Sequence, residues 1–372
     1  MDVFKIEKNK SYFIFHISSA EVLGSIVSYD FESKKPKIVF FTKKKIEFNK
    51  NLESDIFKKN TENALEKVCQ SLEDYLSILG QEVIDRAFVF LTSPWVKKNI
   101  FTLNDERISP FKVSEKYLKG IIENAGSIKD NETLLKVDIM SIKANGYNVT
   151  LPDLIDKKVS KLEISLLDTV LKKRMEKGLD GVIGSKFPFL ETTFLGFLPT
   201  FFNQIQKIYN TDSDFAFLDF SGEYSDFGLF IDNKIEVLSA YPIGINKILR
   251  ILVVEKIAKN FDQAEYLFDL YLKKRLDEDV SLKIKNVVDK ESGSLREFIK
   301  KVSGGKMEID LIGDIFVFTP SFKTQVIVKD LKIFKNLIFI DKLFLKDFVF
   351  VEDEKYFNNF IALEGQYIFD VF

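Results

Sequence analysis

Two carboxylates beside one short turn are the residues of this sequence that most resemble catalytic machinery. Asp219 and Asp226 flank the segment 221–225, SGEYS. Paired carboxylates can act as a general acid and a general base, which is one interpretation of this pair. Asp side chains beside a turn also hold hairpins together through hydrogen bonds to the backbone, and that role needs no ligand. The sequence around the turn leaves both interpretations open.

His16 and Cys69 are the single histidine and the single cysteine of the chain. One cysteine excludes a disulfide framework and a zinc site built from thiolates, and one histidine excludes zinc sites that need two imidazoles. A serine triad would depend on His16 alone. Because His16 lies in an apolar run, we expect it to be a hydrogen-bonded core residue. We expect Cys69 to be an inert, half-buried thiol at the edge of a helix stripe.

Two further segments carry groups that could bind a ligand. Glu265 could contact a ribose, although together with Asp262 it also fits a capping box at a helix N-terminus. Gly304, Gly305 and Lys306 lack the GxxxxGK[ST] spacing of a phosphate loop, so we expect a flexible turn there.

The composition is that of a globular chain with more than one lobe. The 372 residues exceed what one hydrophobic core usually holds, and the 38 phenylalanines are expected to dominate the core. The 54 basic and 56 acidic side chains leave a formal net charge of −2, so no nucleic-acid partner is expected. The longest uncharged run, 192–206, is too short to span a bilayer and no signal-peptide stretch is visible, so we expect a cytoplasmic protein.

The first part of the chain predicts a strand meander, a long helix and a buried strand. Apolar runs place these elements at 11–18, 21–31, 35–48, 56–79 and 86–92. Residues 93–175 begin with a polar stretch, which a helix and further strands follow, and they are interpreted as a small helix-and-strand insert. Ser114 is expected to cap its helix, and Asn145-Gly146 is a strong hairpin signal. The strands of this insert are expected at 134–142, 147–151 and 158–173, the last running into a helix.

The last part of the chain repeats the opening arrangement. A second meander is expected at 215–220, 226–231 and 234–244, helices at 245–259 and 262–275, strands at 306–318, 335–340 and 344–351, and a final helix at 354–369. Two strand meanders, each followed by helices, predict a duplicated α/β architecture.

The segment 218–244, LDFSGEYSDFGLFIDNKIEVLSAYPIG, resembles the second phosphate hairpin of the actin-like ATPase superfamily. That hairpin is an Asp-x-Gly-Gly-x-x-Thr-Asp turn followed by a strand pair and a Pro-Ile-Gly-Gly stretch. AEYLF at 264–268 is similar to the superfamily's Ala-Glu-x-x-Lys. The insert at 93–175 lies where the FtsA/PilM branch carries its own subdomain. The resemblance covers most of the chain and implies an actin-like (ribonuclease H-like) duplicated two-lobe α/β fold with a small α+β insert subdomain of FtsA/PilM type.

The resemblance also implies a division of the chain. The expected parts are 1–92 as part of the first lobe, 93–175 as the insert, 176–212 as the return to the first lobe, 213–340 as the second lobe with a helical subdomain at 245–305, and 341–372 as a closing strand and helix.

In this superfamily two hairpin loops clamp the nucleotide phosphates through backbone N–H groups, which requires glycine, and an Asp beside each turn holds magnesium. The resemblance therefore implies a vestigial nucleotide site, with Asp219 as the magnesium ligand if magnesium-ATP is bound. Its residues would be Ser18, Ser19, Asp219, Ser221, Gly222, Ser225, Asp226, Gly244 and Glu265.

The sequence departs from the superfamily pattern where nucleotide would be touched. The departures are His16 and Ser18 for the Asp and Gly of the first loop, Ser221 for the first Gly of the second, Glu223 and Tyr224 as added charge and bulk, Thr319-Pro320-Ser321-Phe322 for the adenosine turn, Phe268 for the Lys after Ala-Glu and Ile245 for a Gly. They imply a chain without efficient ATP hydrolysis, which binds no cofactor or binds ATP and Mg²⁺ only weakly.

Three functions are compatible with the resemblance. The first is a cytoplasmic scaffold of PilM or FtsA type that binds the cytoplasmic tail of an inner-membrane protein, PilN-like or a division protein. It would reach the membrane through this partner and could self-associate into filaments or dimers. The second is a nucleotide-gated ATPase that polymerises or closes its lobes, and the third is a sugar or acetate kinase. The departures and the insert favour the first, with a short peptide bound between insert and first lobe. No membrane-targeting tail of FtsA type is visible, which favours PilM.

Overall fold

The structure is a computed structural model. It describes residues 10–30, 35–47, 53–79, 83–123, 129–209, 214–231, 234–304, 314–318, 328, 336–340, 345, 349–351 and 353–371.

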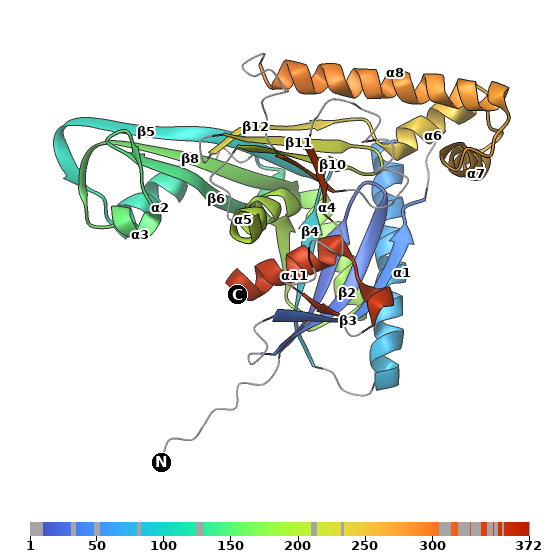
Figure 1. The fold of residues 1–372 in the computed structure, drawn as a ribbon. Coiled ribbons are helices and arrows are strands. Elements are labelled where there is room, and N and C mark those ends of the chain that lie inside the picture. Colours follow the sequence, from blue (N-terminus) through green and yellow to red (C-terminus); the bar gives the residue numbers. More distant parts are fainter. Residues whose placement is uncertain are drawn as a thin grey trace.

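The first lobe is built on a six-stranded sheet with the order β15-β3-β2-β1-β4-β9 (Figure 1). The first three strands along the chain, β1, β2 and β3, form the antiparallel meander that the sequence predicts. β4 pairs with β1 in parallel. The strands are β1 (Lys10–Ile17), β2 (Glu21–Asp30), β3 (Lys35–Lys45), β4 (Ile84–Leu91), β9 (Thr192–Gly196) and β15 (Phe350–Val351).

Both faces of this sheet are buried, which explains why every residue of β1 after Lys10 is buried. Side chains alternate between the faces of a strand. Phe13 and Phe15 therefore pack with one pair of helices, α1 (Ser54–Leu79) and α4 (Lys173–Lys186), whereas Ile14 packs on the opposite face.

Cys69 is more deeply buried than its position at the edge of the apolar face of its helix predicted. It is completely inaccessible, not half-buried, because α4 lies beside α1 and covers the edge of the stripe. Burial raises the pKa of the Cys69 thiol to about 12, so the thiol stays protonated at neutral pH.

The second lobe repeats the first, with the sheet order β12-β11-β10-β13-β14. Again three strands form an antiparallel meander and a further strand pairs with the first of them in parallel, so the predicted duplication is confirmed. The strands are β10 (Phe215–Phe220), β11 (Ser225–Ile231), β12 (Lys234–Tyr241), β13 (Asp314–Phe318) and β14 (Asn336–Phe339). The predicted strands at 306–318 and 344–351 are described only at 314–318, 345 and 349–351.

The helices of the second lobe lie on the side of its sheet away from the first lobe (Figure 1). They are α6 (Ile245–Val254), α7 (Phe261–Leu272) and α8 (Glu278–Val302). α6 ends five residues before the predicted boundary at 259, where Lys256 adopts a positive φ of 58°. The N-cap of α7 is Asn260, whose side chain accepts a hydrogen bond from Gln263 N at 2.9 Å, so the predicted capping box of Asp262 and Glu265 is wrong.

Two helices and their phenylalanines join the lobes. α5 (Phe197–Tyr209) and α11 (Asn359–Val371) lie between the two sheets (Figure 1). They share one buried cluster with β1 and β4 of the first lobe and with β10 and β13 of the second. The lobes therefore share one hydrophobic core, in addition to the cluster that each lobe packs under its own helices.

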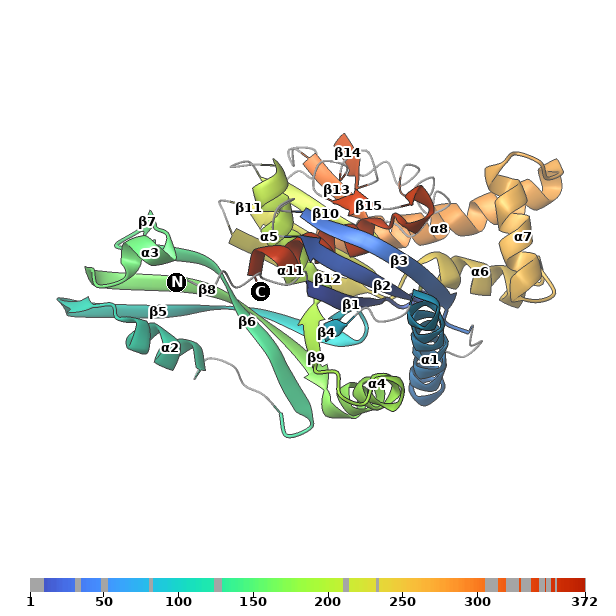
Figure 2. The ribbon, with the colours of Figure 1, turned by 90° about the horizontal axis from the view of Figure 1, so that it is seen from below.

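The insert is a four-stranded sheet, β5-β8-β6-β7, which projects from the first lobe (Figure 2). Ser114 caps its first helix as predicted, because its hydroxyl accepts from Tyr117 N at 3.2 Å. Asn145 and Gly146 have φ of 51° and 88° in a tight hairpin, which confirms the turn. The elements are β5 (Val96–Lys112), α2 (Glu115–Glu123), β6 (Glu132–Ala144), β7 (Tyr147–Asn148), α3 (Leu151–Leu154) and β8 (Lys158–Lys172).

Two details of the insert differ from expectation. The polar stretch that leads from residue 93 to the first helix of the insert contains the 17-residue strand β5, which the sequence did not predict and which pairs along its length with β8. The strand predicted at 147–151 ends at Asn148, because Thr150 caps a short helix with Pro152 in its first turn. In the described part of the chain no helix is long and apolar enough to cross a bilayer.

Candidate functional site

Two hairpin turns from different lobes touch each other. The turn at 18–20 joins β1 to β2, and the turn at 221–224 joins β10 to β11. Ser19 Oγ accepts hydrogen bonds from Glu223 N at 2.8 Å and from Tyr224 N at 3.3 Å. A Cβ placed on Gly222 would lie 2.7 Å from the Cα and N of Ala20, so only glycine permits this approach. The turns in which the sequence suggested phosphate loops therefore meet in space.

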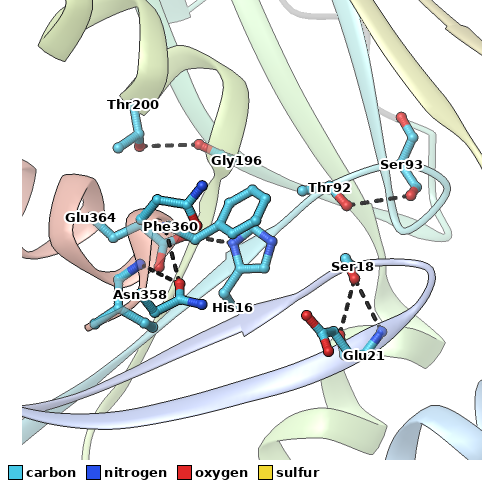
Figure 3. A network of polar contacts seen from close by, with 12 residues as sticks. His16, Ser18, Glu21, Thr92, Ser93, Gly196, Thr200, Asn358, Phe360 and Glu364 are labelled. Atoms are coloured by element: carbon cyan, nitrogen blue, oxygen red, sulfur yellow. Dashed lines mark hydrogen bonds and ion pairs between the residues drawn. The ribbon is translucent and has the colours of Figure 1, made fainter. Parts of the chain in front are cut away.

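Ser18 closes the first turn on itself. Its hydroxyl accepts from Ala20 N and Glu21 N, both at 3.1 Å, and donates to Glu21 O at 3.1 Å (Figure 3). Its carbonyl accepts from Trp95 Nε1 at 2.9 Å. The polar groups of Ser18 thus bond to the protein.

The charge that Glu223 adds to the second turn is paired. Glu223 Oε1 lies 2.7 Å from Arg250 Nη2 of α6, and both side chains are largely buried. The first amides of α6 bond to the same turn, Ile245 N to Ser221 O at 3.1 Å and Asn246 N to Gly222 O at 3.0 Å. The second turn is consequently fixed by the N-terminus of α6.

Asp226 is held by three donors from the start of the insert. Its Oδ1 accepts from Ser93 Oγ and from Lys98 Nζ, each at 2.7 Å, and its Oδ2 accepts from Ser93 N at 3.2 Å. The side chains of Lys98 and Asp226 are only 6% and 4% exposed. A buried carboxylate with this many donors is stable without a ligand.

Asp219 lies opposite Asp226 in the β10–β11 pairing and is buried. Burial raises its pKa well above the usual value and the Asp226 charge adds to this, while Lys98 and the Ser221 hydroxyl act in the other direction. Its Oδ1 has no hydrogen-bond partner among the described residues. The raised pKa favours a neutral carboxyl group at Asp219 in this arrangement.

The remaining predicted site residues divide into two groups. Gly244 lies at the same contact, because a Cβ there would be 2.2 Å from Gly222 O, and Ser225 Oγ donates to Ile243 O at 2.6 Å. Glu265 is elsewhere: it lies on α7 and pairs with Lys45 of β3 at 2.7 Å. The proposed adenosine turn, 319–322, lies outside the described residues.

His16 is a hydrogen-bonded core residue, as predicted from its apolar strand. Its Nδ1 is 2.6 Å from Glu364 Oε1, and both residues are at most 1% exposed. Figure 3 shows the imidazole turned toward α11, where its ring centre lies 4.2 Å from that of Phe360. Burial lowers the pKa of His16 to about 3 and raises the pKa of Glu364 well above its usual value, which favours a neutral pair.

Sequence reasoning missed the partners of the predicted residues. Ser93, Lys98, Arg250 and Glu364 each bond to a residue that had been singled out, but from a distant part of the chain. Glu364 alone gave a signal, as an acidic residue within the apolar run FIAL-GQYIF.

The contact between the turns, as the structure describes it, does not fit a magnesium–nucleotide complex. The amides of Glu223 and Tyr224 that could bind a phosphate donate to Ser19, and Lys98 places its ammonium group 2.7 Å from Asp226 Oδ1. Within the described residues, no cluster of three or more His, Cys, Asp or Glu side chains could hold a metal ion.

A cavity lies beside this contact, between the insert and the first lobe. Its volume is about 330 Å³. Phe57 and Trp95 stack in its wall, with ring centres 4.7 Å apart. The lining residues are Ser54, Asp55, Phe57, Lys58, Pro94, Trp95, Lys172, Arg174, Met175 and Tyr224.

Neither a protein-family model nor a curated protein matches the sequence. Among solved structures, the chain is similar to PilM in a PilM–PilN type IV pilus biogenesis complex, with a TM-score of 0.63 and 11% identity over 96% of this chain and 97% of the other. A Bacteroides thetaiotaomicron protein with actin-like ATPase fold and unknown function gives 0.42 at 9% identity, covering 99% of both chains. The ethanolamine utilization protein EutJ from Carboxydothermus hydrogenoformans gives 0.47 at 12%, covering 96% and 89%. The chain has the actin-like ATPase fold, in a two-lobe form similar to that of PilM.

Proposed function

We propose that the chain is a PilM-like scaffold that binds the cytoplasmic tail of an inner-membrane protein of PilN type, without efficient ATP hydrolysis. The observation that carries the proposal is the similarity to PilM over nearly the whole of both chains, in a structure that also contains PilN. The contact between the two turns supports the lack of efficient ATP hydrolysis, because the backbone amides and the carboxylate suited to a phosphate and a cation already have partners within the protein.

The cavity between insert and first lobe is suited to an anchoring side chain of such a tail. Its volume of about 330 Å³ is at the lower end of the range of roughly 300–1,000 Å³ for small-ligand pockets. Trp95 and Phe57 offer a flat apolar wall, which favours an aromatic or aliphatic side chain.

The charges around the cavity favour an acidic flank on the bound tail. Arg174 pairs with Asp55 at 2.9 Å across exposed surface, and Lys172 is exposed at the end of β8 with no ion pair to a described residue. Lys58 pairs with Glu62. The lining thus carries three cations against one acid, so we expect a peptide with an apolar anchor beside Asp or Glu.

Trp95 is the single tryptophan of the chain, so its fluorescence reports directly on this cavity. Titrating the protein with synthetic peptides of the cytoplasmic tails of candidate inner-membrane partners is expected to change the Trp95 emission in a saturable way. Lys172→Glu should weaken binding of an acidic tail by about tenfold, equivalent to about 1.4 kcal/mol.

The matched control is Lys285→Glu, the same charge change at an exposed site on α8, far from the cavity along the fold. It should leave the affinity unchanged. Equal losses in both variants would show that binding follows net charge and not this cavity. If no tail alters the Trp95 emission or is retained by the immobilised protein, the scaffold proposal is wrong.

A further inference from the structure

The two turns, and the start of the insert beside them, are held to the second lobe by groups whose chemistry is that of a phosphate and its cation. A phosphate bound in a hairpin turn accepts hydrogen bonds from successive backbone N–H groups. Ser19 Oγ does the same here, because it accepts from the consecutive amides of Glu223 and Tyr224. Ser19 belongs to the first lobe and both amides belong to the second, so this one oxygen bridges the lobes.

Lys98 supplies the positive charge that a cation would supply. Its ammonium group lies 2.7 Å from Asp226 Oδ1 and is almost completely buried. It also acts electrostatically on Asp219, the neighbouring carboxyl group across the β10–β11 pair. The positive charge of the Lys98 ammonium group neutralises the negative charge of the buried Asp226 carboxylate. No metal ion is then required to balance that charge.

The position of Lys98 in the chain adds the insert to this contact. Residues 93–98 lead from β4 of the first lobe into β5 of the insert. Ser93 and Lys98 from this segment both bond to Asp226 of the second lobe. Between them Trp95 bonds to Ser18 O and lines the cavity. First lobe, insert and second lobe therefore meet at one buried set of polar contacts.

We infer that Ser19 and Lys98 replace the nucleotide phosphate and its cation as the link between the lobes, so that this actin-like fold is held closed by its own side chains. The inference concerns the lobes and does not depend on the identity of the partner.

Hydrogen exchange at two backbone amides tests the proposed role of Ser19 as the group that replaces the phosphate. In Ser19→Ala the amides of Glu223 and Tyr224 lose their acceptor and should exchange at least about tenfold faster, while amides within β10 and β11 remain protected. Ser19→Thr keeps a hydroxyl group and should preserve the wild-type rates. Uniformly faster exchange throughout the second lobe, or unchanged rates at 223 and 224, would overturn the assignment to Ser19.

Thermal unfolding of a double-mutant cycle tests the proposed role of Lys98 as the group that replaces the cation. Lys98→Met leaves the Asp226 charge buried without its counter-charge and should lower the Tm by roughly 5–10 °C. Adding Asp226→Asn should recover most of that loss, because the neutral pair needs no counter-charge. Additive losses in the double variant would contradict the role of Lys98. If Lys98→Met gives no folded protein, Lys98→Arg, which keeps the charge, must retain the wild-type Tm.

The same wild-type protein is then exposed to magnesium and ATP. Exchange at the amides of Glu223 and Tyr224, and the Tm, should stay unchanged at millimolar ATP, because those donors are already bonded. A saturable rise in Tm, which mass action predicts for any ligand that binds the folded state, would overturn the inference. It would leave the tail-binding proposal intact, since Trp95 fluorescence measures that proposal separately.

Discussion

Replacing Phe201 by alanine is expected to lower the free energy of unfolding by about 3–5 kcal/mol. Phe201 is completely buried on α5. Its ring lies 4.2 Å, centre to centre, from Phe217 of β10 and 5.3 Å from Phe318 of β13. Truncation removes these contacts and leaves a cavity that tightly packed aromatic neighbours fill only partly. Urea unfolding followed by circular dichroism measures the loss.

Phe189 provides the matched control for this substitution. It is fully exposed in the connection after α4, so Phe189→Ala makes the same chemical change with no loss of burial and should alter stability by no more than about 0.5 kcal/mol. Equal effects in the two variants would mean that the shared core is not packed as described. Because α5 and α11 join the lobes in one cluster, wild-type unfolding should also be a single transition.

The second large effect is a dependence of stability on pH that comes from His16 and Glu364. An unfolded Glu ionises near its ordinary pKa of 4.5, whereas burial raises the pKa of Glu364 well above that in the folded state. The folded state therefore holds a proton that the unfolded state has released. Above pH 4.5 the contribution of Glu364 to stability falls as pH rises, by about 1.4 kcal/mol per unit, until the raised pKa is reached.

His16 has the opposite sign. Its pKa falls from 6.5 to about 3 on burial, so the unfolded state binds the extra proton between these values, and stability is lost as pH falls through this range. Between pH 4.5 and 6.5 the two contributions offset each other. The pair holds one proton in the folded state wherever that proton resides, so the prediction does not depend on which group carries it.

Glu364→Gln isolates the carboxyl contribution because glutamine keeps a hydrogen-bonding partner for His16 but does not titrate. Relative to this variant, the wild type should lose stability as pH rises above about 5.5, by about 1.4 kcal/mol per pH unit until the raised pKa of Glu364 is reached. Urea midpoints at a series of pH values measure the difference. Parallel curves for the two proteins would contradict a buried neutral carboxyl group at Glu364.

Local signals in the sequence predicted local structure well. Asn145-Gly146 specified its turn and Ser114 its helix cap, because both depend on residues three positions away or fewer. The meeting of Asp219 and Asp226 was also accessible, since they flank one hairpin and pair directly across it. The cap of α7 was assigned wrongly because several polar residues precede the helix, and the turn after α6 decides that Asn260 starts it.

The partners that decide the chemistry of the candidate site come from far along the chain. Lys98 meets Asp226 and Glu364 meets His16 only after the insert and the C-terminal helix have packed against the lobes. No periodicity or spacing in the sequence links such pairs. Likewise, the hydroxyl of Ser19 became informative only when the backbone amides that it accepts from were placed beside it.

The hydrogen bonds from the amides of Glu223 and Tyr224 to Ser19 have a physiological consequence. A bond to a diffusible ligand is populated according to the concentration of that ligand. The population of a bond between two parts of one chain is set by the protein itself and does not depend on the concentration of a ligand. If Ser19 and Lys98 hold the lobes closed as we propose, the arrangement of the lobes would be the same in growing and in energy-starved cells and would not follow the ratio of ATP to ADP.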